Sequence, residues 1–370
     1  MKKVGLIINP IAGMGGRVGL KGTDGEDTLE KAIKLGALPQ APKRALSALK
    51  ELLLLKERIE IITCSGDMGE NQARELGFKT RVLLEVENKN TQSSHTIKAA
   101  KSILKESADL LIFAGGDGTA RDIYNAIGDK MVVIGIPAGV KIHSPVYAIN
   151  PKNAGKLALE YVMGRISSIK EVEVMDIDEE AFRKNRVSTR LYGYLYIPFE
   201  KNLLQGKKAP TPLGEEIAQK TIGLYVVDNM IDDVFYIVGP GSTTRPIMET
   251  LKLPNTLFGV DIVYNKRLIK KDACEKEILN TIEGKTSKLI ITPIGGQGYL
   301  FGRGNQQISS EVIKKVGKEN IMVVSTIHKI QSLNMKPFYV DTGTEEMDRF
   351  LKGYVRVITG YNEEIMYSVK

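Results

Sequence analysis

A carboxylate stands in the middle of a glycine-rich turn. Residues 114–119 read AGGDGT, with Asp117 between glycines, after the apolar run LLIFA and before a helical pattern. Glycines where a strand leads into a helix let backbone N–H groups approach an anion, so the turn suits phosphate. A carboxylate repels phosphate unless it orients Mg²⁺ or takes a proton from an attacking hydroxyl. Asp117 therefore predicts phosphoryl transfer at this turn.

Two further glycine-rich turns follow other apolar runs. They are NPIAGMGG at residues 9–16 and GIPAG at residues 135–139. One such turn could simply allow tight chain geometry. Turns that follow parallel strands fall on the same edge of a sheet, so we expect the three to meet and form one phosphate site.

Two common nucleotide signatures are absent. In IAGMGGRVG, Val18 occupies the position of the third glycine of the dinucleotide fingerprint, and the acid expected after the second strand is missing. GKT at residues 284–286 resembles the end of a P-loop, but Leu279 stands where that motif needs glycine. The glycine turns therefore belong to another kind of nucleotide or phosphate site.

The first third of the chain alternates strand and helix patterns. Strands are predicted at 4–9, 59–64, 81–86, 110–114 and 132–136, and helices at 68–76, 95–106 and 119–127. Apolar strands separated by helices indicate a doubly wound, Rossmann-like α/β domain, which we place at residues 1–145. The long excursion at 16–56 predicts a lid or binding loop between the first two strands.

Residues 146–370 predict a second domain of mixed α/β type, partly β-rich. A helix at 152–163 follows Asn150 and Pro151, which suit its N-cap and first position. Strands are expected at 172–178, 190–198, 235–239, 258–264, 289–294 and 321–326, and helices at 246–251, 272–283 and 310–316. Residues 201–216 have the composition of a mobile surface loop, and the last strands could return to the first domain.

Composition restricts the class of protein. The 370 residues suggest two domains, and the net charge of +8 suits an anionic small molecule such as a nucleotide, or is simply a lysine-rich surface. No basic run is interleaved with aromatics, and no apolar run could span a bilayer, so neither nucleic acid nor membrane is an expected partner. The start MKKVGLIINP is better explained as a first strand than as a signal peptide, which predicts a cytoplasmic protein. Two distant cysteines exclude a disulfide framework and a structural zinc site.

An ordered set of motifs resembles a known family. NPIAGMGGRVGLKGTDG, GGDGTARD, GIPAGVKIHS, VMDIDEEAFR, GPGSTT and TPIGGQGYLFGRGNQQIS follow one another from residue 9 to about residue 310. This set is similar to the ATP-NAD kinase-like family related to the AcoX proteins, within the NAD kinase and diacylglycerol kinase superfamily. The resemblance implies Mg²⁺-dependent phosphorylation of the NAD 2′-hydroxyl by ATP or polyphosphate, giving NADP. Alternatives are a lipid or other small-alcohol kinase on the same scaffold, or a non-catalytic nucleotide-binding protein linked to acetoin metabolism.

The resemblance also assigns roles to residues. Asp117 would be the general base, and the phosphate donor would be held by Asn9, Gly13, Gly15, Gly16, Gly115, Gly116, Gly118 and Thr119, with Gly139 along the nucleotide. NAD kinases also grip the acceptor with an asparagine followed by an acid. Here the nearest candidate, Asn125, precedes Ala126, so the acceptor-binding residues must differ. A homodimer or homotetramer is expected from the family.

Further polar residues are candidates for binding nucleotide or metal. Candidates for phosphate, ribose or base contacts are Lys21, Asp24, Arg121, Ser242, Thr243, Arg303, Asn305 and Gln306. Candidates for Mg²⁺ are Asp117, Asp176 and Asp178, of which the last two alternate along one predicted strand. The three histidines lack the spacing of a metal site, so His143 and His328 are expected to be structural.

Overall fold

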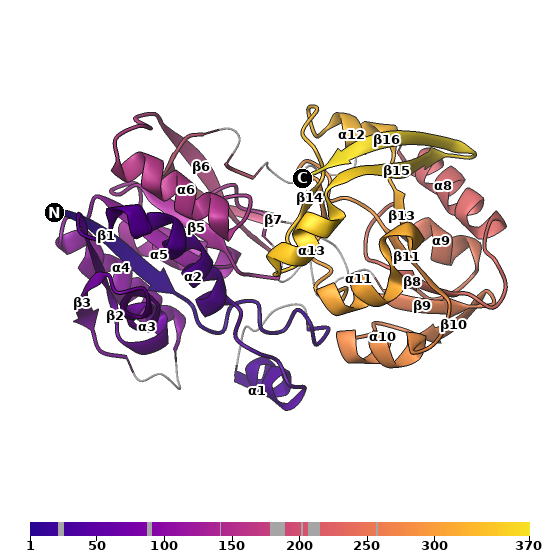
Figure 1. The fold of residues 1–370 in the computed structure, drawn as a ribbon, viewed down its shortest axis with the longest axis horizontal. Helices are drawn as coiled ribbons and strands as arrows, with labels where there is room; N and C mark the ends of the chain where they lie inside the picture. Colours follow the sequence, from indigo (N-terminus) through magenta and orange to yellow (C-terminus); the bar gives the residue numbers. More distant parts are fainter. Residues whose placement is uncertain are drawn as a thin grey trace. The chain divides into compact units, whose positions relative to one another are not determined.

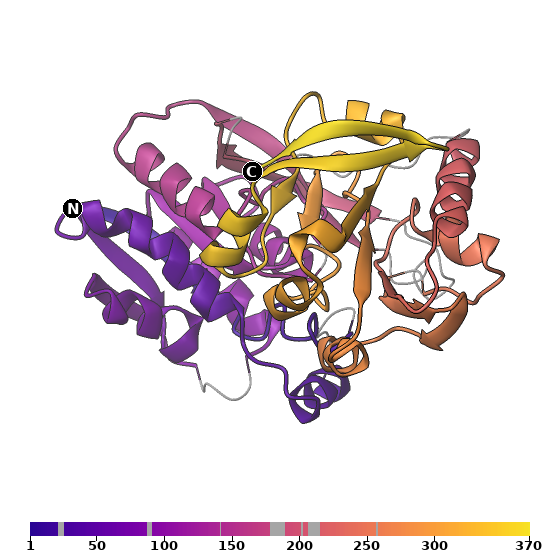
Figure 2. The ribbon, with the colours of Figure 1, turned by 45° about the vertical axis from the view of Figure 1, so that its right-hand side comes forward.

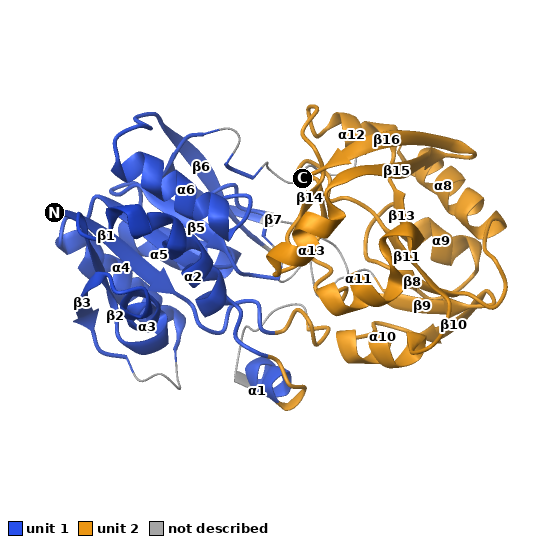
Figure 3. Cartoon of the chain, in the orientation of Figure 1, with its two compact units in different colours: residues 1–14, 22–33, 38–207 blue, residues 15–21, 34–37, 208–370 orange. Residues whose placement is uncertain are grey.

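The computed structural model describes residues 1–20, 26–86, 91–140, 142–177, 189–200, 203–205, 215–256 and 258–370 (Figures 1 and 2). The chain forms two compact units (Figure 3). Unit 1 contains residues 1–14, 22–33 and 38–207, and unit 2 contains residues 15–21, 34–37 and 208–370. The predicted boundary after residue 145 falls inside unit 1.

Unit 1 is built on a parallel five-stranded sheet with the strand order β3-β2-β1-β4-β5. Its strands are β1 (Lys2–Ile8), β2 (Ile59–Cys64), β3 (Lys79–Leu84), β4 (Leu110–Gly115) and β5 (Val133–Pro137). Each had been predicted from an apolar run, because strands buried on both faces contain few polar residues. The predicted α/β fold with a Rossmann-like first domain is confirmed.

Helices cover both faces of this sheet. One group consists of α2 (Ala41–Glu51), α3 (Glu70–Glu75) and α6 (Pro151–Val162), and the other of α4 (Ser93–Lys105) and α5 (Asp117–Ile127). Neighbouring residues of β1 show the two faces. A Cβ at Gly5 would meet Ile103 of α4, whereas Leu6 lies beside Gly69, which precedes α3. This doubly wound arrangement leaves the carboxyl ends of the strands for ligands.

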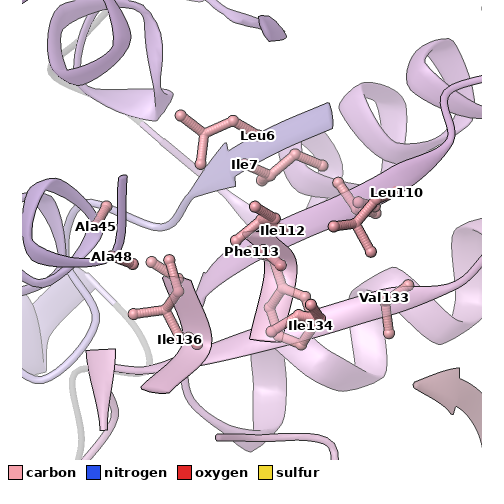
Figure 4. Close-up of a cluster of buried hydrophobic side chains, with 14 of the residues drawn as sticks. Leu6, Ile7, Ala45, Ala48, Leu110, Ile112, Phe113, Val133, Ile134 and Ile136 are labelled. Carbon is pink, nitrogen blue, oxygen red and sulfur yellow. The ribbon is translucent and has the colours of Figure 1, made fainter. Parts of the chain in front are cut away.

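The segment predicted as a lid or binding loop is largely helical. It contains α1 (Glu26–Lys34), α2 and the 3-10 helix η1 (Leu52–Leu55). Buried Ala45 and Ala48 of α2 face the sheet in Figure 4. Gly155 of α6 lies so close that an added Cβ would meet the Ala48 carbonyl oxygen at 2.1 Å. One face of residues 41–55 therefore belongs to the core, through Ala41, Ala45, Ala48, Leu49, Leu52 and Leu55. The sequence conceals this because alanine is a weak apolar signal.

An antiparallel pair of strands completes unit 1. It consists of β6 (Ile169–Ile177) and β7 (Thr189–Pro198). Val172, Val174, Leu195 and Ile197 of this pair are buried in the same hydrophobic cluster as the parallel sheet. Unit 1 extends past residue 145 for this reason. The predicted mobile loop at 201–216 lies mainly outside the described residues.

Unit 2 is built on a mixed seven-stranded sheet with the order β10-β9-β8-β11-β13-β15-β16. Its strands are β8 (Phe235–Val238), β9 (Asp261–Tyr264), β10 (Arg267–Lys270), β11 (Ser287–Ile291), β13 (Ile321–Val324), β15 (Gly353–Gly360) and β16 (Glu363–Val369). The strands β8, β11, β13 and β15 are parallel, and the others pair antiparallel. The last two strands therefore belong to unit 2, and not to the first domain.

Helices cover the sheet of unit 2 as well. They are α8 (Glu216–Asp228), α9 (Arg245–Thr250), α10 (Glu275–Ile282), α11 (Ser310–Val316), α12 (Ile327–Gln331) and α13 (Glu345–Leu351), and a small pair β12 (Tyr299–Phe301) and β14 (Tyr339–Val340) stands apart. Ile237 and Val238 of β8 contribute to two different buried clusters, so both faces are covered. None of the helices in the described ranges is long and apolar enough to cross a membrane.

Candidate active site

The first two glycine turns meet where the winding of unit 1 changes direction. β1 lies at the middle of the sheet and pairs with β4, which follows it in space but not in sequence. Asn9, directly after β1, donates its backbone N–H to the Ala114 carbonyl at 2.9 Å. Its side-chain Nδ2 donates to Thr119 Oγ1 at 3.1 Å. In doubly wound sheets this point is the usual ligand site.

The third glycine turn closes onto the same place. The N–H groups of Ala138 and Gly139 donate to the Gly115 carbonyl at 2.8 and 3.0 Å. A Cβ at Gly139 would meet the Gly116 Cα at 2.6 Å. Gly13 has φ +78°, and a Cβ there would meet the Ala138 carbonyl oxygen at 2.0 Å. The three turns thus form one backbone assembly, as the sequence predicts, with no room for side chains where they touch.

Asp117 lies within this assembly as the first residue of α5. It is 4% exposed, and its carboxylate is surrounded by nitrogen atoms of two residues. Oδ2 accepts from the His143 backbone N–H at 2.6 Å and lies 3.0 Å from His143 Nδ1, while Oδ1 accepts from the Ser144 N–H at 3.0 Å. A buried carboxyl group held by three polar contacts keeps one orientation, which suits acid–base chemistry.

The His143–Ser144 backbone is held by further hydrogen bonds. Ser144 Oγ donates to the Met175 carbonyl of β6 at 2.8 Å and accepts from the Met175 N–H at 2.9 Å. Gln205 Nε2 donates to the Ser144 carbonyl at 2.6 Å. His143 had been expected to be structural, but the structure places it against Asp117. Its position immediately after the third glycine turn was a usable signal.

Arg121, one turn further along α5, forms an ion pair with Asp176 of β6. Its Nη1 lies 2.8 Å from Asp176 Oδ2, and its guanidinium stands 5.4 Å from the centre of the Tyr192 ring. Burial opposes the charge of Arg121, but Asp176 and Tyr192 raise its pKa overall. Asp176 thus neutralises a cation in the structure, which favours a positioning role over metal binding.

No metal centre is preassembled in the part of the chain that the structure describes. No group of three or more His, Cys, Asp or Glu side chains there could hold a metal ion. Asp117 is engaged by N–H donors and Asp176 by Arg121. Asp178, Lys21 and Asp24 lie outside the described residues. The described carboxylates alone therefore do not fit a protein-held Mg²⁺.

Several predicted residues belong to unit 2. A Cβ at Gly16 would meet Gln306 at 3.0 Å, and Gly15 is next to it in the chain. Thr243, in the turn after β8, accepts a hydrogen bond from buried Lys329 Nζ at 2.8 Å, and the same Nζ donates to Thr292 Oγ1 at 3.1 Å. Ser242 beside it is half-buried. This turn therefore presents hydroxyl groups around a lysine at the carboxyl ends of β8 and β11.

Arg303 and Asn305 have partners within their own surroundings. Arg303 Nε lies 3.6 Å from Asp341 Oδ2, and its guanidinium stands 4.6 Å from the centre of the Tyr299 ring. Asn305 Nδ2 donates to the Leu300 carbonyl at 2.7 Å, and its Oδ1 accepts from the Gly302 N–H at 3.1 Å. Both residues shape this part of unit 2, and their predicted contacts with a ligand stay predictions.

Comparison with known proteins agrees with the motif resemblance. A model of the ATP-NAD kinase N-terminal domain matches residues 4–166, and a model of the ATP-NAD kinase C-terminal domain matches residues 231–369. No curated protein matches the chain.

Two solved structures titled "putative diacylglycerol kinase" from Bacillus anthracis str. Sterne are similar, with TM-scores of 0.27. One is 18% identical and covers 48% of this chain and 46% of its own, and the other is 15% identical and covers 64% and 58%. The chain thus spans about half the length of these two proteins. Since the two family models together cover most of the sequence in the expected order, the chain belongs to the ATP-NAD kinase family.

Proposed function

We propose that the protein is an NAD kinase that transfers a phosphoryl group from ATP or polyphosphate to the 2′-hydroxyl of NAD, giving NADP. Family membership indicates a phosphotransferase with an alcohol group as acceptor. The observation that carries the proposal is Asp117. It is a buried carboxylate, held by His143 and Ser144, at the point where three glycine turns meet.

The glycine turns supply the phosphate-binding part of the proposed site. Backbone N–H groups at the start of α5 favour an anion, and the absence of side chains lets phosphate oxygens approach the backbone. The proposed donor-binding residues of unit 1 are Asn9, Gly13, Gly115, Gly116, Gly118, Thr119, Arg121 and Gly139. Asn9 and Thr119 hold each other by a hydrogen bond, so the first and second turns respond to the donor together.

Asp117 supplies the negative charge that promotes removal of the acceptor's hydroxyl proton. Positioned acid–base groups of this kind contribute about 10²–10⁴-fold to rate. We expect Mg²⁺ to be held mainly by the phosphates of the donor, because Mg²⁺ in such sites usually has few protein ligands. When bound, it would neutralise charge on the transferred group.

We propose that further residues contact the nucleotide. The candidates are Gly15, Gly16, Lys21, Ser242, Thr243, Arg303 and Asn305, together with Asp24. The hydroxyl-rich turn after β8 supports this assignment, since Thr243 is fixed by Lys329 while Ser242 remains half-buried. Alanine substitution of Ser242 tests it, because a contact with NAD requires a higher KM for NAD and an unchanged KM for the donor.

The central experiment measures NADP formed from NAD with Mg²⁺ and either ATP or polyphosphate. Asp117→Asn keeps the shape of the side chain and removes its charge, so kcat should fall by about 10²–10⁴-fold. Asp129→Asn, at an exposed acid just after α5, is the matched control and should leave kcat unchanged. Equal activity of Asp117→Asn and the wild type would contradict the role of Asp117. Turnover of another alcohol but not of NAD would show that the acceptor is that alcohol, and the proposed substrate would be wrong.

We further expect a homodimer or homotetramer located in the cytoplasm, with small-molecule nucleotides as its partners. The support is family membership and, within the described ranges, the lack of a helix that could cross a membrane. Light scattering of the purified protein measures the oligomeric state, and a monomeric mass would contradict the expectation. Fractionation of cells places the protein, and its recovery with membranes would contradict a cytoplasmic location.

A further inference from the structure

We propose that Arg121 stabilises the phosphoryl group while it is transferred, and that Asp176 is the positioning residue that holds the Arg121 guanidinium beside Asp117. This inference rests on the proposed kinase function. It goes further than a contact with the donor, because it assigns Arg121 to the group that moves. The observations that carry it are the two contacts that place the guanidinium, and the strand that holds both Arg121 and the turn of Asp117.

The guanidinium of Arg121 lies beside the second glycine turn. Arg121 comes four residues after Asp117 in α5, and residues four apart lie on the same face of a helix. The atom nearest to a Cβ added at Gly118 would be Arg121 Nη2, at 4.0 Å. Nη1 of the same group lies 2.8 Å from Asp176 Oδ2. One end of the guanidinium is thus bound to β6, and the other end lies beside the residue that follows Asp117.

Close packing of α5 on the strand pair β6 and β7 fixes this arrangement. A Cβ at Gly193 of β7 would meet the Tyr124 ring of α5 at 2.1 Å, so the helix approaches the strands closely. The Arg121 Cζ lies 5.4 Å from the centre of the Tyr192 ring, which adds a cation–π contact to the ion pair. A guanidinium that is already oriented loses little entropy when a ligand binds to it.

Two adjacent residues of β6 hold Asp117 and Arg121 relative to each other. Met175 makes two backbone hydrogen bonds with Ser144 Oγ, and the Ser144 N–H donates to Asp117 Oδ1. The next residue, Asp176, binds Arg121. The pairing of β6 with β7 shifts its register just before Met175, and such irregularities re-aim side chains and are frequent beside active sites. This strand therefore determines the separation of the carboxyl group and the cation.

A cation at this position is what the proposed reaction requires. The phosphates of the donor bring negative charge next to a carboxyl group, and like charges repel. Arg121 is the only basic residue in the segment 112–128, IFAGGDGTARDIYNAIG. Because Asp117 is proposed to act on the attacking hydroxyl, a group beside Asp117 lies nearest to the phosphorus under attack. The planar guanidinium presents several N–H donors, which suit the oxygens of the transferred group.

In the transfer step, the acceptor oxygen forms a bond to the transferred phosphorus while the bond from that phosphorus to the donor's bridging oxygen breaks. The hydroxyl proton moves to Asp117, which later releases it to solvent, and the bridging oxygen leaves with the shortened donor. Arg121 forms and breaks no covalent bond. Its N–H groups donate to the oxygens of the transferred group, and this contact is strongest when negative charge spreads over those oxygens.

Arg121→Ala tests the role of the guanidinium. We expect kcat to fall by about 10³-fold, with KM for NAD and for the donor within about threefold, because the contact acts mainly in the transition state. Added guanidinium ion should restore part of kcat, which a merely structural loss would not allow. Arg165→Ala is the matched control, since Arg165 is exposed and pairs with Glu160 at 3.0 Å, and its kcat should not change. An unchanged kcat in Arg121→Ala, or a higher KM for the donor alone, would overturn the inference.

A double-mutant cycle tests the positioning role of Asp176. Asp176→Asn keeps the shape of the side chain and removes its charge, so a less well-placed guanidinium should lower kcat by about 10–10²-fold. The double variant Arg121→Ala/Asp176→Asn should be no slower than Arg121→Ala alone, because Asp176 then has no guanidinium to position. Losses that multiply in the double variant would overturn this role of Asp176.

A third variant and the wild type separate the possible failures. Arg121→Lys keeps the positive charge and loses the planar group, so it covers the case in which the alanine variant does not fold. Its kcat should lie between those of the wild type and Arg121→Ala, and a wild-type kcat would overturn the need for a guanidinium. A wild type that phosphorylates another alcohol but not NAD would instead contradict the proposed function. The same variants, assayed with that alcohol, would then still judge Arg121.

Discussion

Tyr147 supports the second glycine turn, residues 114–119, through a hydrogen bond and through packing. Its hydroxyl donates to the Gly116 carbonyl, the residue just before Asp117, and its ring packs edge to face against Phe113 with centroids 5.5 Å apart. The ring is fully buried and needs Gly135, where a Cβ would meet it at 2.5 Å. Tyr147 therefore connects the core of unit 1 to the backbone that carries Asp117.

Tyr147→Phe should lower the free energy of unfolding by about 0.5–1.5 kcal/mol, because the half-buried Gly116 carbonyl loses the Tyr147 hydroxyl as a donor and keeps the Ala120 N–H. Because the packing of the ring is retained, the loss of stability should be smaller than that of a substitution that leaves a cavity. Urea unfolding of the two proteins measures the difference. Tyr354→Phe, at an exposed tyrosine, is the control and should have no effect. Equal midpoints for wild type and Tyr147→Phe would contradict the proposed support.

Some of the site follows from single residues, and some does not. Asp117 could be predicted because glycines, an acid and a following helix are adjacent in sequence. His143 is harder to assign, because its contact with Asp117 is tertiary and the only local signal is its position four residues after Gly139 of the third glycine turn. The side-chain amide of Asn305 makes its hydrogen bonds within its own loop, to Gly302 and Leu300, although the sequence suggested that it binds a ligand. Residue type alone does not distinguish a polar group that binds a ligand from one that shapes a turn.

At the scale of elements, the turns after β1, β4 and β5 depend on close backbone contact. Gly139 and Gly116 approach so closely that a Cβ at Gly139 would meet the Gly116 Cα at 2.6 Å, and a Cβ at Gly116 would meet the Gly139 Cα at 3.1 Å. At Gly118, in contrast, the atom nearest to an added Cβ would be Arg121 Nη2 at 4.0 Å. The first pair is thus needed for the fold of the turns, and Gly118 is available for a different role.

Gly139→Ala should therefore destabilise the protein by about 1–3 kcal/mol, as overpacking usually does, and should reduce kcat by displacing the turn that carries Asp117. Gly118→Ala is the matched comparison for stability alone, and it should unfold at the wild-type midpoint or slightly above it, since alanine favours a helix. Thermal unfolding measures both. A Gly139→Ala variant as stable as the wild type would contradict the close approach of Gly139 to Gly116.

Elements were predictable where their pattern is local. The strand at 59–64 was placed without error, because a continuous apolar run marks a buried strand. The helix α2 was missed because its buried face is mostly alanine, and the expected loop is in fact core. β15 and β16 were missed as well. Their exposed residues dilute the apolar signal, and their place in the sheet is set by pairing with each other and with β13.

At the scale of the whole molecule, the two cysteines report on the two units separately. Cys64 ends β2 in unit 1 and is buried, and burial raises the pKa of its thiol from 9.0 to about 12. Cys274 precedes α10 in unit 2 and is partly exposed. The thiolate is the nucleophile that attacks a thiol reagent, so Cys64 should be inert in the folded protein.

At pH 8 we expect one labelled cysteine in the native protein and two after unfolding. Cys274→Ser should leave none in the native state. Because the folded pKa of Cys64 is raised, its contribution to stability is complete below pH 9 and is lost as the pH rises toward 12. Two labelled thiols in the native protein at pH 8 would contradict the burial of β2.

The division of the chain between the units has a consequence for its synthesis. Residues 15–21 belong to unit 2, where the Arg17 carbonyl accepts the N–H of Glu275 at 3.1 Å. On the ribosome, residues 18–274 must be made before this partner exists, which takes on the order of 10–50 s at about 5–20 residues per second. Once β5 has been made, the nascent chain contains all five strands of the first sheet, while the Arg17 carbonyl still lacks its partner in Glu275. We therefore expect residues 15–21 to stay accessible to chaperones and proteases until residue 275 has been made.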